Sequence, residues 1–294
     1  MAAGYALHES NFGTAIVLEA GANLVPHAHS ESQLALWLGG SRARARVGQQ
    51  TVDYSENLGL GVNAYEAHDM VLLENTGPAL FLVFVISQDW LEHRSATEGK
   101  SFSFKSPQVF VDAKLRRSCW KVLNLMLSPA PARHEVDTLV LELLEDAVIG
   151  SEPVSKRPVP LPVTLDHRLR SAINYMRENV VEGGSMEEIA ARVGLSRAHF
   201  FALFRDQLRT TPQVFWSGVK VEEAMKRVSE GAVLTDVALD LGFSAPGNFS
   251  RFFKEHTGVS PSIFKRATRS ADSPVTVTGV PRMPAEKSVY GNGE

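Results

Sequence analysis

Three histidines in the first quarter of the chain have the residue type and spacing that metal or ligand chemistry needs. His27 and His29 are two residues apart, so on an extended strand both side chains point to the same side. Gln33 follows at an even spacing, and His68 comes later in the chain. Three imidazole nitrogens bind a first-row divalent metal at about 2.0–2.2 Å and leave one coordination position open. The same four side chains could instead hydrogen-bond an organic effector, or only line the interior of a barrel.

A repeat in the last third of the chain is the second such feature. The segment that starts at Ser185 returns 48 residues later with the same spacing of small residues: Ala190, Gly194 and Ser196 recur as Ala238, Gly242 and Ser244. The pair Phe204-Arg205 recurs 49 residues later as Phe253-Lys254, so the second copy contains one inserted residue. Two copies in register indicate one structural unit used twice.

Each small residue of the repeat has a physical reason. The alanine lets a second helix cross close above it. The glycine four residues later permits a positive φ at the turn. The serine two residues further on, Ser196 or Ser244, can cap the next helix. This order is typical of a helix-turn-helix unit, whose second helix enters the DNA major groove.

The spacer between the copies also reads as a helix. Thr211-Pro212 provides a cap and a proline for the first turn, and an apolar face continues until Gly231. One connecting helix that holds two recognition helices would fix their separation. At a separation of roughly 34 Å, both could enter successive major grooves on one face of DNA.

Residues 165–268 resemble the DNA-binding domain of AraC/XylS-family transcription regulators. The second copy carries the resemblance, from Gly242-Phe-Ser-Ala-Pro-Gly-Asn-Phe-Ser-Arg-Phe-Phe-Lys-Glu-His-Thr-Gly258 through Pro261 to Arg266. The resemblance implies a regulator that binds double-stranded promoter DNA and whose front domain responds to a small-molecule effector. It also implies a homodimer and, if the chain is an activator, RNA polymerase as a further partner.

The resemblance assigns base reading to exposed positions on the two recognition helices. In the first copy these are Arg197, Ala198, Phe201 and Ala202, and in the second they are Pro246, Gly247, Asn248 and Arg251. Arg251 is the best candidate for direct readout, because a guanidinium pairs bidentately with guanine. Phosphate contacts are expected from Arg205, Lys254, Lys265 and Arg266, and from the helix starts at Ser196 and Ser244. The phenylalanines Phe200, Phe204, Phe249 and Phe253 are expected in the core.

The histidine-bearing segment, Gly21 to Gly40, resembles the first motif of cupin domains, and His68 stands where the histidine of the second motif would lie. The resemblance implies a β-barrel whose histidines hold either an effector or a divalent metal; no cofactor is certain. Two departures weaken the metal alternative: Gln33 occupies the carboxylate position, and Asn63-Ala-Tyr-Glu replaces the second motif's proline and glycine pattern. A metal-binding cupin fused to a DNA-binding domain is the alternative function. No pair of a nucleophile and a base stands out in the sequence, so an enzyme is not expected.

The chain therefore divides into an α+β protein of two domains. Residues 1–112 are predicted as a cupin-like barrel, 113–150 as a helical pair that could form a dimer interface, and 164–269 as the all-α DNA-binding domain. The proline-rich stretch 151–163 reads as a linker and 270–294 as a disordered tail. The helical pair could instead pack on the barrel.

Charge and composition agree with this division. Residues 1–162 carry a net charge of −5 and residues 163–270 a net charge of +3. Cys119 stands alone, so no intramolecular disulfide forms and a reducing compartment is suitable. No apolar run approaches the roughly 20 residues of a membrane span, and the N-terminus lacks the pattern of a signal peptide. A cytoplasmic protein is expected.

Overall fold

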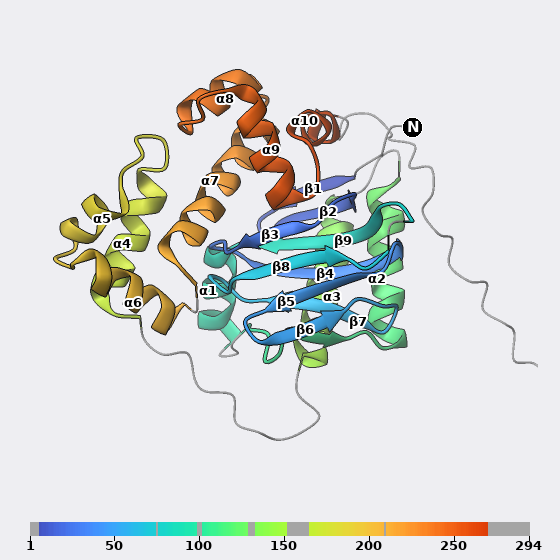
Figure 1. Ribbon diagram of the computed structural model, residues 1–294. Coiled ribbons are helices and arrows are strands. Elements are labelled where there is room, and N and C mark those ends of the chain that lie inside the picture. Colours follow the sequence, from blue (N-terminus) through green and yellow to red (C-terminus); the bar gives the residue numbers. More distant parts are fainter. Residues whose placement is uncertain are drawn as a thin grey trace, which may run out of the picture.

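The computed structural model describes residues 6–74, 76–98, 102–128, 133–151, 165–208 and 210–269. Apart from Ser151, the predicted linker lies outside the described residues, and so does the predicted tail. The α+β, two-domain class predicted from the sequence is confirmed: strands fill the first part of the chain and helices the last (Figure 1).

The front domain is built from two antiparallel sheets. The six-stranded sheet has the order β1-β2-β9-β4-β7-β10, and the four-stranded sheet has the order β3-β8-β5-β6. The strands are β1 (Leu7–Ser10), β2 (Gly13–Ala20), β3 (Leu24–His27), β4 (Ser32–Gly40), β5 (Ala43–Val47), β6 (Gln50–Asp53), β7 (Leu58–Val62), β8 (His68–Leu72), β9 (Ala79–Ile86) and β10 (Gln108–Phe110).

The six-stranded sheet is the middle of three layers. Along β9, Leu80, Leu82 and Phe84 pack with the helices behind the sheet, whereas Phe81 packs with the four-stranded sheet on the other side. Alternate side chains of a strand point to opposite faces. The unbroken apolar run of β9 is therefore explained by burial on both faces.

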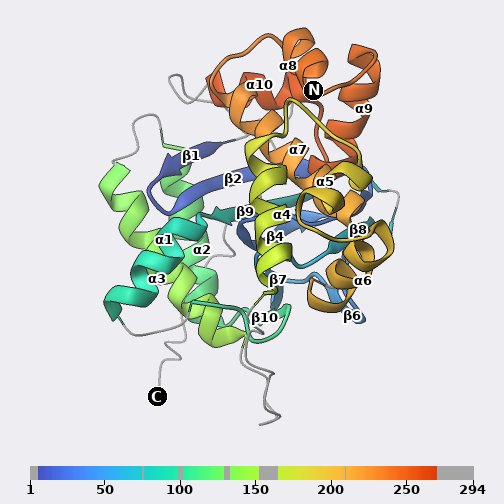
Figure 2. The ribbon, with the colours of Figure 1, turned by 90° about the vertical axis from the view of Figure 1, so that its left-hand side faces the viewer.

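Three helices cover the outer face of the larger sheet: α1 (Gln88–Glu98), α2 (Ala113–Met126) and α3 (Arg133–Gly150) (Figure 2). The apolar stripes predicted for the last two are buried against the sheet within one chain, including Leu115, Val122 and Leu143. The alternative in which this pair packs on the barrel thus accounts for its apolar faces. A dimer through α2 and α3 would have to use their other sides.

The back domain consists of seven described helices: α4 (His167–Glu178), α5 (Met186–Arg192), α6 (Arg197–Gln207), α7 (Pro212–Ser229), α8 (Leu234–Asp240), α9 (Pro246–Thr257) and α10 (Pro261–Arg269). α5 and α6 form one helix-turn-helix unit and α8 and α9 form the other, with α7 between them (Figure 1). The capping predicted at Thr211 is present, because its side chain accepts from the Val214 amide.

The turns of both units have the predicted geometry. Gly194 has a φ of +70° and Gly242 a φ of +79°, a region in which a Cβ is strained. Ala190 and Ala238 are buried at the helix crossings. The four core phenylalanines predicted in α6 and α9 are fully enclosed, with at most 1% of each residue exposed.

The prediction that Ser244 caps the second recognition helix is wrong. Ser196 caps α6 by accepting from the His199 amide, but α9 begins one residue later in its copy, at Pro246, after Ala245. The residue inserted in the second copy accounts for this shift. The Ser244 hydroxyl instead accepts from the side-chain amide of Asn248 at 3.2 Å. A proline in the first turn starts α9 without a side-chain cap.

Candidate functional site

The residues predicted to face DNA form two exposed surfaces on α6 and α9. All but one of the predicted DNA-binding positions are exposed: Ser196, Arg197, Ala198, Ala202, Arg205, Ser244, Gly247, Asn248, Arg251 and Lys254, with Phe201 half-buried. In contrast, the opposite faces of both helices carry the core phenylalanines. Each recognition helix therefore leaves one side available to a partner.

The cationic side chains predicted to contact DNA differ in the ion pairs and hydrogen bonds that they already make within the protein. The Arg197 guanidinium pairs with Glu187 of α5 at 2.6 Å and lies 4.8 Å from the Phe201 ring centre. Lys265, which was predicted to contact phosphate, is half-buried on α10 and donates to the carbonyl oxygen of Ala232 at 2.6 Å, so its ammonium group is engaged within the domain. Arg251 makes no ion pair or hydrogen bond with another described residue, so its guanidinium is available to a base edge.

A buried histidine cluster occupies the end of the front domain that faces the helices. One nitrogen each from His27, His29 and His68 lies within 4.8 Å of the other two. The Nδ1–H of each ring donates to a backbone carbonyl: His27 to Val25 at 2.8 Å, His29 to Glu31 at 2.7 Å and His68 to Glu66 at 3.1 Å. A carbonyl can only accept, so each Nε2 carries the lone pair.

The cluster is electrically neutral. Burial and the neighbouring His29 lower the pKa of His27 to about 3, and burial lowers the pKa of His29. For His68, burial together with His27 and His29 lowers the pKa well below its ordinary value. The Nε2 of His29 is buried without a hydrogen-bond partner of normal geometry among the described residues. Neutral imidazoles with free lone pairs are metal ligands or acceptors for a ligand's N–H.

The segment that follows β3 in the front domain packs directly against α7 of the back domain. A Cβ on Gly218 of α7 would lie 1.5 Å from the carbonyl oxygen of Ala28. Only glycine allows two backbones to approach so closely. Beside this contact, Glu222 accepts from the Ser30 amide at 2.6 Å and from its hydroxyl at 2.8 Å. The front domain is thereby fixed directly to the helix that joins the two helix-turn-helix units.

Two carboxylates meet at this contact. The Ser30 hydroxyl is also within 2.9 Å of the Glu31 carboxylate. Burial and the neighbouring Glu31 raise the pKa of Glu222 well above its ordinary value. Neither carboxylate forms an ion pair with a cation among the described residues.

Tyr65 replaces the glycine pattern of the second cupin motif and has an unusual backbone. Its φ is +68°, which is uncommon for a non-glycine residue. The Tyr65 amide donates to the His29 carbonyl at 2.7 Å, and its ring lies 5.6 Å from that of Phe215 in α7. The departure from the cupin pattern thus supplies a contact between the domains.

A cavity of about 370 Å³ lies between the domains, large enough for a small organic molecule. Three of the four predicted effector residues, His27, His29 and Gln33, line this cavity from the front domain. The fourth, His68, belongs to the histidine cluster but does not line the cavity. The wall also includes Leu7, Glu9, Thr14, Ile16, Glu31, Val85, Val221, Glu222, Met225, Lys226, Ser229, Glu230, His256, Thr257 and Phe264.

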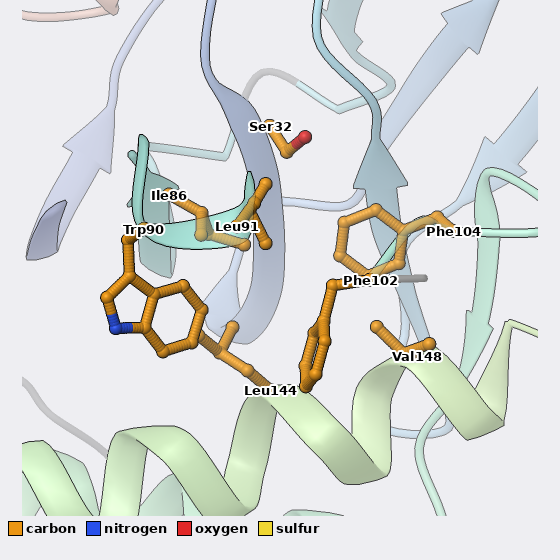
Figure 3. Close-up of a pocket in the computed structure, with 8 residues that line it drawn as sticks. All are labelled: Ser32, Ile86, Trp90, Leu91, Phe102, Phe104, Leu144 and Val148. Carbon is orange, nitrogen blue, oxygen red and sulfur yellow. The ribbon is translucent and has the colours of Figure 1, made fainter. Parts of the chain in front are cut away.

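A second cavity, between the larger sheet and α3, is an unsuitable effector site. Figure 3 shows it enclosed by Trp90, Phe102, Phe104 and Leu144, with the Ser32 hydroxyl as the one oxygen among the drawn side chains. Its volume is about 10 Å³, which corresponds to about one water molecule. The cavity between the domains is therefore the better candidate for a ligand.

The back-domain half of the cavity could not be foreseen from the sequence. Glu222 and His256 of the cavity wall, and Gly218 at the adjacent domain contact, lie on helices whose apolar pattern predicts only an intradomain core. One signal was present: a glycine inside the long helix α7 lowers helix stability unless a close approach requires it. The three histidines, in contrast, are brought together as predicted.

Comparison with known proteins identifies the back domain. A family described as a helix-turn-helix domain matches residues 166–267. The raffinose operon transcriptional regulatory protein RafR of Pediococcus pentosaceus is 28% identical over 97 residues, which cover 33% of this chain and 35% of RafR. The chain thus spans about a third of RafR's length. The uncharacterized HTH-type transcriptional regulator YdeC of Bacillus subtilis is 22% identical over 253 residues, 82% of this chain and 85% of YdeC.

Solved structures extend the likeness to both domains. ToxT from Vibrio cholerae, in the apo form of a single-residue variant, matches with a TM-score of 0.59 at 9% identity and covers 89% of this chain and 99% of its own. At this identity the match establishes a shared fold. Together with this fold, the helix-turn-helix family match and the HTH-type relatives confirm the expected resemblance to AraC/XylS-type regulators. No helix in the described ranges is long and apolar enough to cross a membrane.

Gly218→Ala is expected to separate the two domains without unfolding either one. The new Cβ would collide with the Ala28 carbonyl, whereas alanine is favoured over glycine in a helix by about 1 kcal/mol. Small-angle X-ray scattering should show a larger radius of gyration, with helix content by circular dichroism unchanged. Gly247→Ala, whose Cβ would meet nothing within 4 Å, is the control. An unchanged radius of gyration would contradict the close contact.

Proposed function

We propose that this chain is a DNA-binding transcription regulator of the AraC type, which reads promoter DNA with α6 and α9. One observation carries the proposal: two matched helix-turn-helix units present exposed faces at the two ends of α7. The glycine turns and buried alanines hold each reading helix against its partner helix, so its outer side chains are presented in a fixed orientation. Homodimerisation and contact with RNA polymerase stay predictions.

Arg251→Ala is expected to weaken sequence-specific binding by about 1–3 kcal/mol, because the lost guanidinium would have paired with a base edge. Sites are first selected from a random duplex library, and affinities for a selected and a scrambled duplex are then measured by fluorescence anisotropy at fixed salt. Lys254→Ala, a predicted phosphate contact, should weaken binding to both duplexes. Unchanged affinity of Arg251→Ala for the selected site would refute base reading.

We further propose that a small-molecule effector binds in the cavity between the domains. A ligand there would touch the front-domain histidines and the α7 helix at once, so binding would favour one arrangement of the two domains. ToxT has been solved with an unsaturated fatty acid bound. The cavity is negative, the opposite of what a carboxylate ligand needs: Glu9, Glu31 and Glu230 face it, against Lys226. Glu222 also faces it but is left out of this balance, because its raised pKa favours the neutral acid. Cationic organic molecules suit it better than carboxylates.

Octylamine should therefore raise the melting temperature of the protein more than octanoate does. At about 100 times its Kd a ligand stabilises the bound form by about 2.7 kcal/mol, which is measurable by calorimetry. Glu31→Gln keeps an oxygen that can accept from the Ser30 hydroxyl and should reduce the preference for the amine. Glu182→Gln, an exposed carboxylate away from the cavity, is the control. Greater stabilisation by octanoate would overturn the assignment of charge.

A divalent metal in the histidine cluster is the second candidate, and the residues fit it. His27, His29 and His68 each keep a neutral Nε2 free, and that of His29 is an orphaned buried acceptor. Such a metal would supply a positive charge and an open coordination position at the base of the cavity. The backbone carbonyls that hold the Nδ1–H groups would set the orientation of each ring.

Metal content distinguishes this candidate from a purely organic effector. Untagged protein purified without chelator should contain about one metal ion per chain by inductively coupled plasma mass spectrometry. His27→Ala/His29→Ala should lose the ion, because a single remaining imidazole cannot hold it against buffer. His167→Ala, on an exposed side chain of α4, is the control. A wild-type protein that takes up no added Zn²⁺ or Co²⁺ would exclude the metal.

A further inference from the structure

A fourth histidine, from the DNA-binding domain, lies against the cluster. His256 is in the last turn of α9 and has 9% of its surface exposed. Its ring centre is 5.8 Å from that of His27, about as close as the ring of His29, at 5.7 Å. His27 therefore lies between histidines of its own domain and one from the recognition helix.

The His256 ring is held like the other three. Its Nδ1–H donates to the Phe252 carbonyl at 2.8 Å, one turn back along the helix. The Nε2 therefore carries the lone pair, and no described residue hydrogen-bonds to it. Burial lowers the pKa of His256, which favours the neutral, metal-binding form.

The backbone around His256 is seated on the front domain. A Cβ on Gly258 would lie 3.5 Å from both Ala20 and Leu24. Two imidazoles on one tetrahedral metal have ring centres about 5 Å apart, as follows from metal–nitrogen distances of about 2.0–2.1 Å. The His27–His256 spacing is within about an ångström of this value. His256 is not in the group whose ligand nitrogens all lie within 4.8 Å of one another, so its side chain would have to move toward the cluster to reach an ion bound there.

We propose that His256 is the ligand that the DNA-binding domain contributes to a metal ion held by His27, His29 and His68, which links ion binding to the position of α9. The inference rests on the metal candidate above. Three imidazoles leave one position of a tetrahedral ion open. Glu31, another side chain nearby, lies at the domain contact beside Ser30 and Glu222. His256 fills the position from the helix that also carries Arg251 and Lys254.

Cobalt substitution of the full-length protein tests the proposal directly. In His256→Cys, a thiolate bound to Co²⁺ should add a sulfur-to-cobalt charge-transfer band in the near ultraviolet. The wild-type protein should lack this band, because burial raises the pKa of its own Cys119 to about 12. His199→Cys, which puts an exposed thiol on the other recognition helix, is the matched control and should also lack it.

His256→Ala supplies the second measurement. Loss of a ligand should weaken Co²⁺ binding by at least the 10–100-fold typical of removing an outer-sphere partner. It should also weaken the visible bands of four-coordinate cobalt, while His199→Ala changes neither. The same spectrum and Kd in wild-type and His256→Ala, with no new band in His256→Cys, would overturn the role of His256 and leave a three-histidine site. A wild-type protein that binds no Co²⁺ or Zn²⁺ would overturn both the role of His256 and the three-histidine metal site, whereas the DNA-binding proposal would stand.

Discussion

The arrangement of the two domains depends on the contact between the Ala28 carbonyl and the backbone of α7 at Gly218. Any side chain at this position would separate the two backbones, and the neighbouring interactions would be lost with it. Ser30 could not reach Glu222, and the Tyr65 ring could not reach Phe215. The cavity between the domains lies beside this contact, because Glu222, one turn further along α7, is part of its wall.

α7 connects this contact to both DNA-reading units. One side of the helix receives the front domain, and residues such as Phe215 and Val228 join the core shared by the helix-turn-helix units. A rigid helix transmits displacement along its length without a loop to absorb it. A ligand that changes the contact at Gly218 or Glu222 would therefore act on both units at once, as the proposed function requires.

Sequence reasoning was most successful where a local rule determines the structure. The glycine turns, the buried alanines and the cap at Thr211 depend on neighbours within a few residues, and all were predicted. Ser244 was not, because a one-residue insertion moved the start of α9 past it. The three histidines could be predicted to converge from their spacing and the cupin resemblance. Glu222 and His256 could not, since their role arises only when two domains pack together, and neither helix pattern records that partner.

The two faces of α9 have separate consequences for evolution. The positions Gly247, Asn248, Arg251 and Lys254 are exposed, so under the proposed function they could change to follow a drifting promoter sequence. The buried positions Phe253 and His256 are instead constrained by the back-domain core and by the contact with the front domain. Duplicated copies of such a gene could therefore acquire new operators while keeping the original effector, because the proposed DNA contacts and the contacts with the front domain are on opposite faces of α9.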